Sequence, residues 1–173
     1  ATGHPVGGGW RDVGFFYPAK NTLGLTDTYF LYAVPYGALR ALSVDPFAAF
    51  TIVVAALSAL GYWSMYALCR LWPRAAPLPS AVAAFIFAYG AMVRFKLMHA
   101  QTYTVMLAPV LALLLVAAYR TSRARVCLAA AGAAGLLYGL IVFSAAQTAW
   151  FLAFVGALVL VCWAMTGCRP RLR

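Results

Sequence analysis

The acidic residue best placed for chemistry in this sequence is Asp27, which stands between Thr26 and Thr28. A carboxylate can take a proton from an acceptor hydroxyl, or it can hold a divalent cation. The same residue could instead lie in the first turn of a helix, where its negative charge interacts favourably with the helix dipole. Asp27 is therefore the candidate catalytic residue, with helix capping as the structural alternative.

A second group of polar side chains lies in one short stretch between apolar segments, and comprises Arg94, Lys96, His99 and Gln101. Arginine offers a planar fork of donors and lysine a point charge, so this group could bind a phosphate or pyrophosphate. Arg94 and Lys96 could also anchor a membrane span among lipid headgroups. His99 could ligate a pigment, whereas a bis-histidine haem would need a second intramembrane histidine. We predict a substrate-binding group at these four positions.

The composition indicates an integral membrane protein. Of the 173 residues, 65% are hydrophobic and only 9% are charged, whereas soluble domains carry about 25% charged residues. So few charges cannot cover a water-soluble surface, which excludes a soluble enzyme and a disordered chain. The net charge of +10 comes from short basic clusters between apolar runs, which are typical of topology signals and lipid-headgroup contacts. We therefore expect membrane lipid as a partner and no nucleic acid.

The cysteines predict neither a metal site nor a disulfide. They form no CxxC pair, and each lies in or beside an apolar run where it can pack as a small apolar residue. We expect no certain cofactor, with a divalent cation at Asp27 as the one alternative. The four cysteines are Cys69, Cys127, Cys162 and Cys168.

Five stretches are apolar enough to predict transmembrane helices. Asp45 is the predicted N-cap of the first of them, with Pro46 at its first helical position. The second has few residues before Arg94, so it must continue past Arg94 and Lys96 by snorkelling or form a short or tilted element. The fourth carries small residues that let another helix approach closely in lipid. The stretches are 46–69, 80–93, 101–119, 126–144 and 149–167.

Residues 1–45 precede this helical bundle of residues 46–173 and form a segment of a different kind. Residues 1–22 are rich in glycine and predict an irregular loop. Residues 23–42 carry aromatic and apolar side chains at roughly helical spacing, interrupted by Pro35. This pattern predicts one helix, or two short ones, in the plane of the membrane interface, with Thr26 as N-cap.

The basic residues predict the orientation of the spans. Eight of them follow the first, third and fifth spans without any acid, whereas all three Asp residues fall on the other side. The positive-inside rule then puts residues 1–45 and the turns 94–100 and 145–148 outside the cytoplasm. A signal or a preceding span is needed to carry such a segment outward, so we expect that one has been removed or that the sequence is part of a longer protein.

Several short motifs resemble bacterial polytopic membrane proteins of the GT-C glycosyltransferase type. The stretch from Arg94 to Gln101, followed by Leu107-Ala108-Pro109, is similar to a later outward turn of those proteins. The resemblance covers roughly residues 15–120. The motifs similar to the family's first outward loop and following helix are Phe15-Phe16-Tyr17-Pro18, Thr22-Leu23-Gly24, Thr26-Asp27, Tyr36-Gly37 and Val44-Asp45-Pro46-Phe47-Ala48.

The resemblance implies an enzyme of the bacterial inner membrane that moves a sugar from a polyprenyl-phosphate carrier to an acceptor at the outer face. In the family an acidic residue of the first outward loop is a catalytic base or metal ligand, and Asp27 is the matching position. Many relatives carry a second acid nearby, where this chain has threonines. The family also uses more spans, so the resemblance implies activity only within a longer chain.

The competing interpretation is a non-catalytic subunit of a larger energy-converting or pigment-binding membrane complex, derived from such a transferase. The aromatic content of 15% and the small residues of the fourth span suit contact with partner subunits or lipid. Both interpretations share one fold class. We predict an all-α polytopic integral membrane protein with about five transmembrane helices, an outward-facing loop and an interfacial helix.

Overall fold

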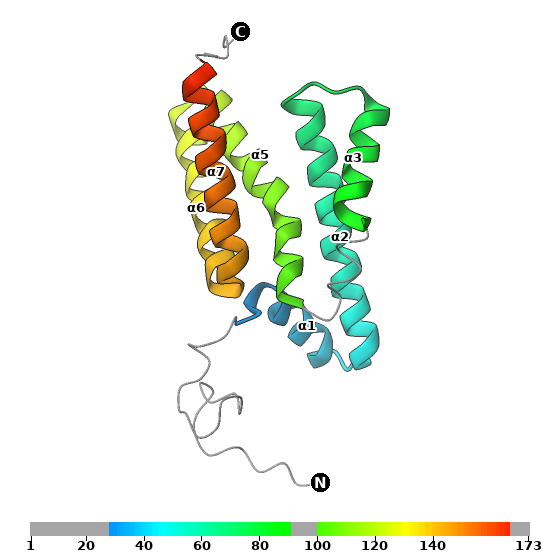
Figure 1. The fold of residues 1–173 in the computed structure, drawn as a ribbon. Coiled ribbons are helices and arrows are strands. Elements are labelled where there is room, and N and C mark those ends of the chain that lie inside the picture. Colours follow the sequence, from blue (N-terminus) through cyan, green and yellow to red (C-terminus); the bar gives the residue numbers. More distant parts are fainter. Residues whose placement is uncertain (1–27, 91–99, 167–173) are drawn as a thin grey trace.

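The computed structural model describes residues 28–90 and 100–166, and over these ranges all regular structure is helical (Figure 1). The predicted all-α fold class is therefore confirmed. In chain order the elements are α1 (Phe30–Ala41), α2 (Pro46–Leu71), α3 (Pro77–Tyr89), the 3-10 helix η2 (Ala100–Leu107), α5 (Ala108–Arg120), α6 (Ala124–Ser144) and α7 (Ala146–Thr166).

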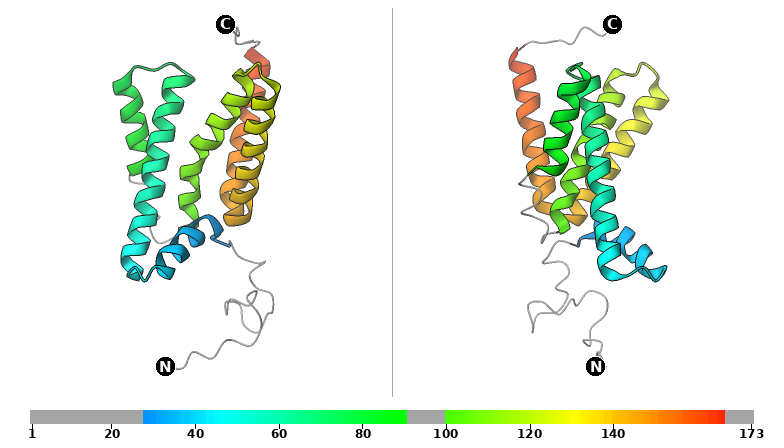
Figure 2. Two further views of the ribbon diagram at one scale, coloured as in Figure 1. Left: turned by 180° about the vertical axis from the view of Figure 1, so that it is seen from behind. Right: turned by 90° about the vertical axis from the view of Figure 1, so that its right-hand side faces the viewer.

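The long helices form two groups that lie side by side. Helices α2 and α3 make an antiparallel hairpin, and α5, α6 and α7 make the second group (Figure 1). The two groups meet where α2 packs against η2 and α5. Helix α1 lies across one end of both groups and so bridges them, as the view from behind shows (Figure 2).

Three helical stretches are long and apolar enough to cross a membrane, namely Pro46–Leu71, Tyr103–Arg120 and Ala124–Ser144. They correspond to the first, third and fourth predicted spans. The stretches Pro77–Tyr89 and Ala146–Cys162 are apolar but shorter. The 13 residues of α3 rise about 20 Å, which is less than the roughly 30 Å of a bilayer's hydrocarbon core. By their length and composition, these three candidate spans suggest a multi-pass membrane protein.

The start of α2 confirms the predicted cap. The Asp45 carboxylate accepts hydrogen bonds from the backbone amides of Phe47 at 2.9 Å and Ala48 at 3.2 Å, and Pro46 occupies the first helical position. The third span differs from its prediction because it begins as the 3-10 helix η2 and becomes α-helical only from Ala108. Pro109 has no amide hydrogen and its ring crowds the preceding turn, so a regular α-helix does not run through this point.

The helix predicted within residues 23–42 exists as α1, but it starts later than expected. Helix α1 is one helix that includes Pro35, and its N-cap is Tyr29. Thr26, the predicted cap, lies outside the described residues, and the helix begins four residues after it. The packed face of α1 carries Tyr32, which is buried, together with the half-buried Leu31 and Tyr36.

Most of the apolar side chains on the bundle face outward. Between 11% and 33% of the residues in the three candidate spans are buried inside the chain. Large side chains such as Trp63, Leu128 and Trp150 are 64%, 73% and 71% exposed. Apolar surface on this scale is unfavourable in water and suits contact with lipid or with other membrane helices.

The 3-10 helix η2 supplies the centre of the core. Met106 is fully buried beside Tyr103 and Ala88. The next residue, Leu107, packs in a second cluster with Ile141 and Ala149. Gly61 of α2 makes close approach of Met106 possible, since a Cβ atom placed on it would lie 2.6 Å from the Met106 sulfur and 3.2 Å from the Met106 Cβ. This contact fixes the spacing between the two groups of helices.

We predict that Gly61→Leu destabilises the protein by about 1–3 kcal/mol, because the new side chain overpacks the contact with Met106. The thermal unfolding midpoint of the chain in detergent, measured by circular dichroism, reports the loss. Gly156→Leu on α7 is the matched control, since a Cβ there meets nothing within 4 Å. An equal midpoint for the two variants would contradict the proposed contact.

Candidate functional site

One end of the bundle, which we call the α1 end, gathers segments from the whole chain. Helix α2 begins there, the start of η2 lies there, and α6 ends where α7 begins (Figure 2). Helix α1 lies across these ends and contacts α2, η2 and α6. The residues predicted to do chemistry lie just before α1 in the sequence, or just before and at the start of η2.

The start of α1 is held to the end of α6 by hydrogen bonds, an arrangement that we call the α1 clamp. The Thr28 hydroxyl donates to the Phe143 carbonyl at 2.5 Å. The Tyr29 amide donates to the Ser144 carbonyl at 3.2 Å, and the Leu31 amide donates to the Ser144 hydroxyl at 3.0 Å. The rings of Phe30 and Phe143 meet edge to face at 5.4 Å between centroids.

The clamp forms because the end of a helix leaves carbonyls without partners. Helix α6 ends at Ser144, and Ala145 leaves the helical conformation, with φ −155° and ψ 81°, before α7 begins. The Phe143 and Ser144 carbonyls thus become free to accept from Thr28 and Tyr29. Tyr29 has a φ of 56°, in the left-handed region that bulky residues rarely adopt, which marks a position held by its surroundings.

Tyr32 lies behind the clamp and carries a polar atom that lacks a partner. Its ring stacks on Tyr36 at 6.0 Å and contacts Phe50 at 5.8 Å. The residue is 8% exposed, and its buried hydroxyl has no hydrogen-bond partner within residues 28–90 and 100–166. Burial raises the pKa of Tyr32 above its ordinary value of 10.0, with smaller contributions from Tyr36 and Tyr103. The hydroxyl is therefore held neutral.

Most of the predicted site residues lie outside the described residues. These are Asp27, Arg94, Lys96 and His99, whereas Gln101 lies in the first turn of η2. The structure describes Thr28, which follows Asp27 in sequence, in the α1 clamp. It also describes η2, which follows His99 in sequence and packs against α1. The described neighbours of both predicted groups thus meet at the α1 end.

Among residues 28–90 and 100–166, no three His, Cys, Asp or Glu side chains group in a way that could hold a metal ion. The cysteines described there, Cys69, Cys127 and Cys162, form no disulfide. Asp45 is occupied as the cap of α2. A cation site would therefore have to draw on side chains beyond these described groups.

The sequence did not reveal Ser144 as a structural residue. It had been counted as the end of the fourth span, yet it is completely buried and accepts from α1 through both its hydroxyl and its carbonyl. A hydroxyl residue at the end of an apolar run was the only available signal. Comparison with models of known families, with curated proteins and with solved structures gave no match to this chain.

We predict that Ser144→Ala destabilises the chain by about 1–3 kcal/mol, because the Leu31 amide loses its acceptor in a buried place. Hydrogen exchange at Leu31 and its neighbours should accelerate together. Ser64→Ala is the control: Ser64 is buried, but its hydroxyl bonds only to the Leu60 and Gly61 carbonyls of its own helix. Unchanged exchange at Leu31 in Ser144→Ala would disprove the role of the clamp.

We predict that Tyr32→Phe leaves the chain as stable or more stable near neutral pH, because it removes a buried hydroxyl that has no partner. Since folding raises the pKa of Tyr32, the folded chain keeps a proton that the unfolded chain releases above about pH 10. Wild-type stability should thus fall as the pH rises through this range, and less so in Tyr32→Phe. Unfolding midpoints at pH 8 to 11 test this, with the exposed Tyr119→Phe as control.

Proposed function

We propose that this chain is a GT-C-like membrane protein that transfers a sugar from a polyprenyl-phosphate carrier to an acceptor at the outer face of a bacterial inner membrane. In this proposal Asp27 is the catalytic base, and Arg94, Lys96, His99 and Gln101 bind the carrier phosphate. One observation carries the proposal: the parts of the chain that follow the two predicted groups in sequence pack together at one end of the bundle. Thr28, which follows Asp27, is bonded to the end of α6 just before α1 begins, and η2, which follows His99, packs against α1.

The distribution of charge supports an outward orientation of the α1 end. Arginines occupy the connections at the opposite end, with Arg70 and Arg74 between α2 and α3 and with Arg120, Arg123 and Arg125 around the connection from α5 to α6. Asp45 lies at the α1 end. By the positive-inside rule the arginine end faces the cytoplasm and the N-terminal segment is extracytoplasmic. If α3 and α7 also cross the bilayer, the chain has five spans.

The proposed reaction exchanges one bond for another at the sugar's anomeric carbon. The acceptor hydroxyl oxygen attacks this carbon and forms the new glycosidic bond, while the bond to the carrier phosphate oxygen breaks and its electron pair leaves with the phosphate. The acceptor proton passes to the Asp27 carboxylate. Arginine and lysine stabilise the negative charge on the departing phosphate. A divalent cation held by Asp27 is the alternative role for this carboxylate.

The described part of α7 favours a second candidate function, that of a non-catalytic subunit in a larger membrane complex. Every residue from 153 to 162 is exposed, and a Cβ atom on Gly156 would meet nothing within 4 Å. Helix α7 contacts the bundle through its first turns, where Ala149 is buried. A helix that is apolar on all sides and packed only at one end offers surface to partner subunits as well as to lipid.

The test of sugar transfer compares Asp27→Asn with the wild-type chain. Membranes that contain the full chain receive polyprenyl-phosphate glucose, mannose or galactose labelled in the sugar, and label in the acceptor fraction is measured. We expect Asp27→Asn to lower transfer at least 100-fold, since a positioned base typically contributes about 10²–10⁴ in rate. Asp45→Asn is the control, because asparagine caps a helix as well as aspartate does.

Equal transfer by wild-type and Asp27→Asn membranes would remove Asp27 from the mechanism. Absence of transfer from all three labelled carriers would contradict the proposal and favour the subunit function. In that case a stable complex should be purified with the chain, and Asp27→Asn should leave it intact.

A further inference from the structure

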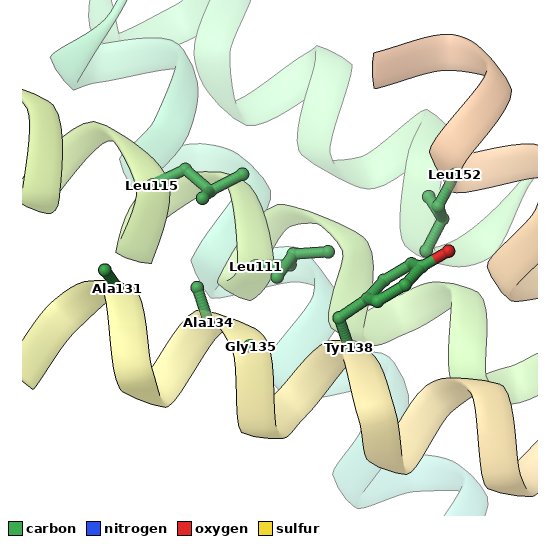
Figure 3. A pocket seen from close by; sticks show the side chains of 7 residues that line it. All are labelled: Leu111, Leu115, Ala131, Ala134, Gly135, Tyr138 and Leu152. Atoms are coloured by element: carbon green, nitrogen blue, oxygen red, sulfur yellow. The ribbon is translucent and has the colours of Figure 1, made fainter. Parts of the chain in front are cut away.

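An open apolar groove of about 350 Å³ lies between α5 and α6 and ends against α7 (Figure 3). Leu111 and Leu115 of α5 form one wall. The other wall includes Ala131, Gly135 and Tyr138 of α6, and Leu152 of α7 lies beside the Tyr138 ring. From Ala131 to Tyr138 the groove follows about 10 Å of helix.

The groove exists because small residues of α6 face large residues of α5. A Cβ atom on Gly135 would meet nothing within 4 Å, so the space beside it is open. The one polar side chain in the lining is Tyr138, and its hydroxyl already donates to the Ala149 carbonyl at 3.2 Å. The lining residues therefore offer no unpaired side-chain donor to a polar ligand. These walls suit an aliphatic chain, which needs contact area but no hydrogen bonds.

Positive charge is concentrated beyond one end of the groove. Arg120 ends α5, and Arg123 and Arg125 stand at the start of α6. All three are exposed. Leu115 and Ala131 lie five and six residues from the nearest of them, which is about 8–9 Å along the helices. Asp45, the acid that the structure describes, lies at the opposite end of the bundle.

We propose that the groove and these three arginines form a binding site for an anionic glycerophospholipid. One acyl chain lies in the groove, and the phosphate lies at the connection between α5 and α6. Basic residues at the membrane surface attract anionic headgroups, while the groove adds contact with a chain. The proposal requires the chain to sit in a membrane, but it does not depend on sugar transfer.

The polyprenyl-phosphate carrier of the proposed reaction is a different ligand, and other residues are proposed to bind it. It also joins a phosphate to an apolar chain, but the residues proposed to bind it, Arg94, Lys96, His99 and Gln101, are not among those that line the groove. The arginine end is the one that the positive-inside rule places at the cytoplasmic leaflet, where anionic glycerophospholipids are attracted by basic residues. We therefore commit to the glycerophospholipid.

Native mass spectrometry of the full chain, delipidated in detergent, tests the proposal. The probes are palmitoyl-oleoyl phosphatidylglycerol and palmitoyl-oleoyl phosphatidylcholine, which carry the same chains and differ in net charge. We expect phosphatidylglycerol to bind at least tenfold more tightly. Replacing Arg120, Arg123 and Arg125 by Gln should lower its affinity to that of phosphatidylcholine.

Gly135→Leu tests the groove independently of charge. The new side chain fits the open space beside α6 and fills the groove, so binding of phosphatidylglycerol should weaken at least fivefold. Gly132→Leu is the matched control on the same helix, because Gly132 is exposed, meets nothing within 4 Å and does not line the groove. Unfolding midpoints of both variants should match that of the wild-type chain.

Three results would overturn the proposal. The first is equal affinity for the two lipids, and the second is unchanged binding in Gly135→Leu. The third is tighter binding of a polyprenyl phosphate than of phosphatidylglycerol, with loss in Gly135→Leu, which would assign the groove to the carrier. None of these results bears on Asp27, so this proposal and sugar transfer can fail separately.

Discussion

The structure depends on how the backbone carbonyls at the end of α6 obtain hydrogen-bond donors. The end of a helix leaves carbonyls that need donors. Here the Thr28 hydroxyl and the Tyr29 amide donate to the carbonyls of Phe143 and Ser144, while the Leu31 amide donates to the Ser144 hydroxyl. The same contact fixes α1 across the bundle, so that its buried Tyr32 packs against α2. Without these bonds α1 would have only its apolar face to position it, and an apolar face allows sliding and rotation that hydrogen bonds do not.

The two ends of the bundle consequently differ in chemistry. At the α1 end, buried hydroxyl groups, aromatic rings and the cap of α2 are brought together by α1 and η2. At the other end, short connections carry exposed arginines, and Leu115 and Ala131 of the groove between α5 and α6 lie five and six residues from the nearest of them. The middle of the bundle is apolar on its outer faces. The proposed sugar transfer and the proposed lipid binding are assigned to opposite ends of the bundle on the basis of this division.

The sequence predicted those parts of the fold that depend on residues close together in the chain. Apolar composition identified the three long spans, and Asp45 with Pro46 identified the start of α2, because capping involves residues only two or three positions apart. The 3-10 start of the third span was missed, since its apolar pattern does not differ from that of an α-helix. The α1 clamp was missed because it joins residues far apart in the chain, and because each of its hydrogen bonds uses at least one backbone group, which every residue type carries. The candidate site at Asp27 and Arg94–His99 stays a prediction, since these residues lie outside the described ranges.

The α1 clamp also has a consequence for biosynthesis. Thr28 and Phe143 are separated by 115 positions along the chain, and synthesis proceeds from the N-terminus. Helix α1 is therefore made before α6 but cannot reach its final hydrogen bonds until α6 has been translated. During that interval Tyr32, which is buried in the folded chain, lacks the packing that the clamp provides. Among the described elements α1 is the earliest in sequence, yet it is one of the last to be fixed in place.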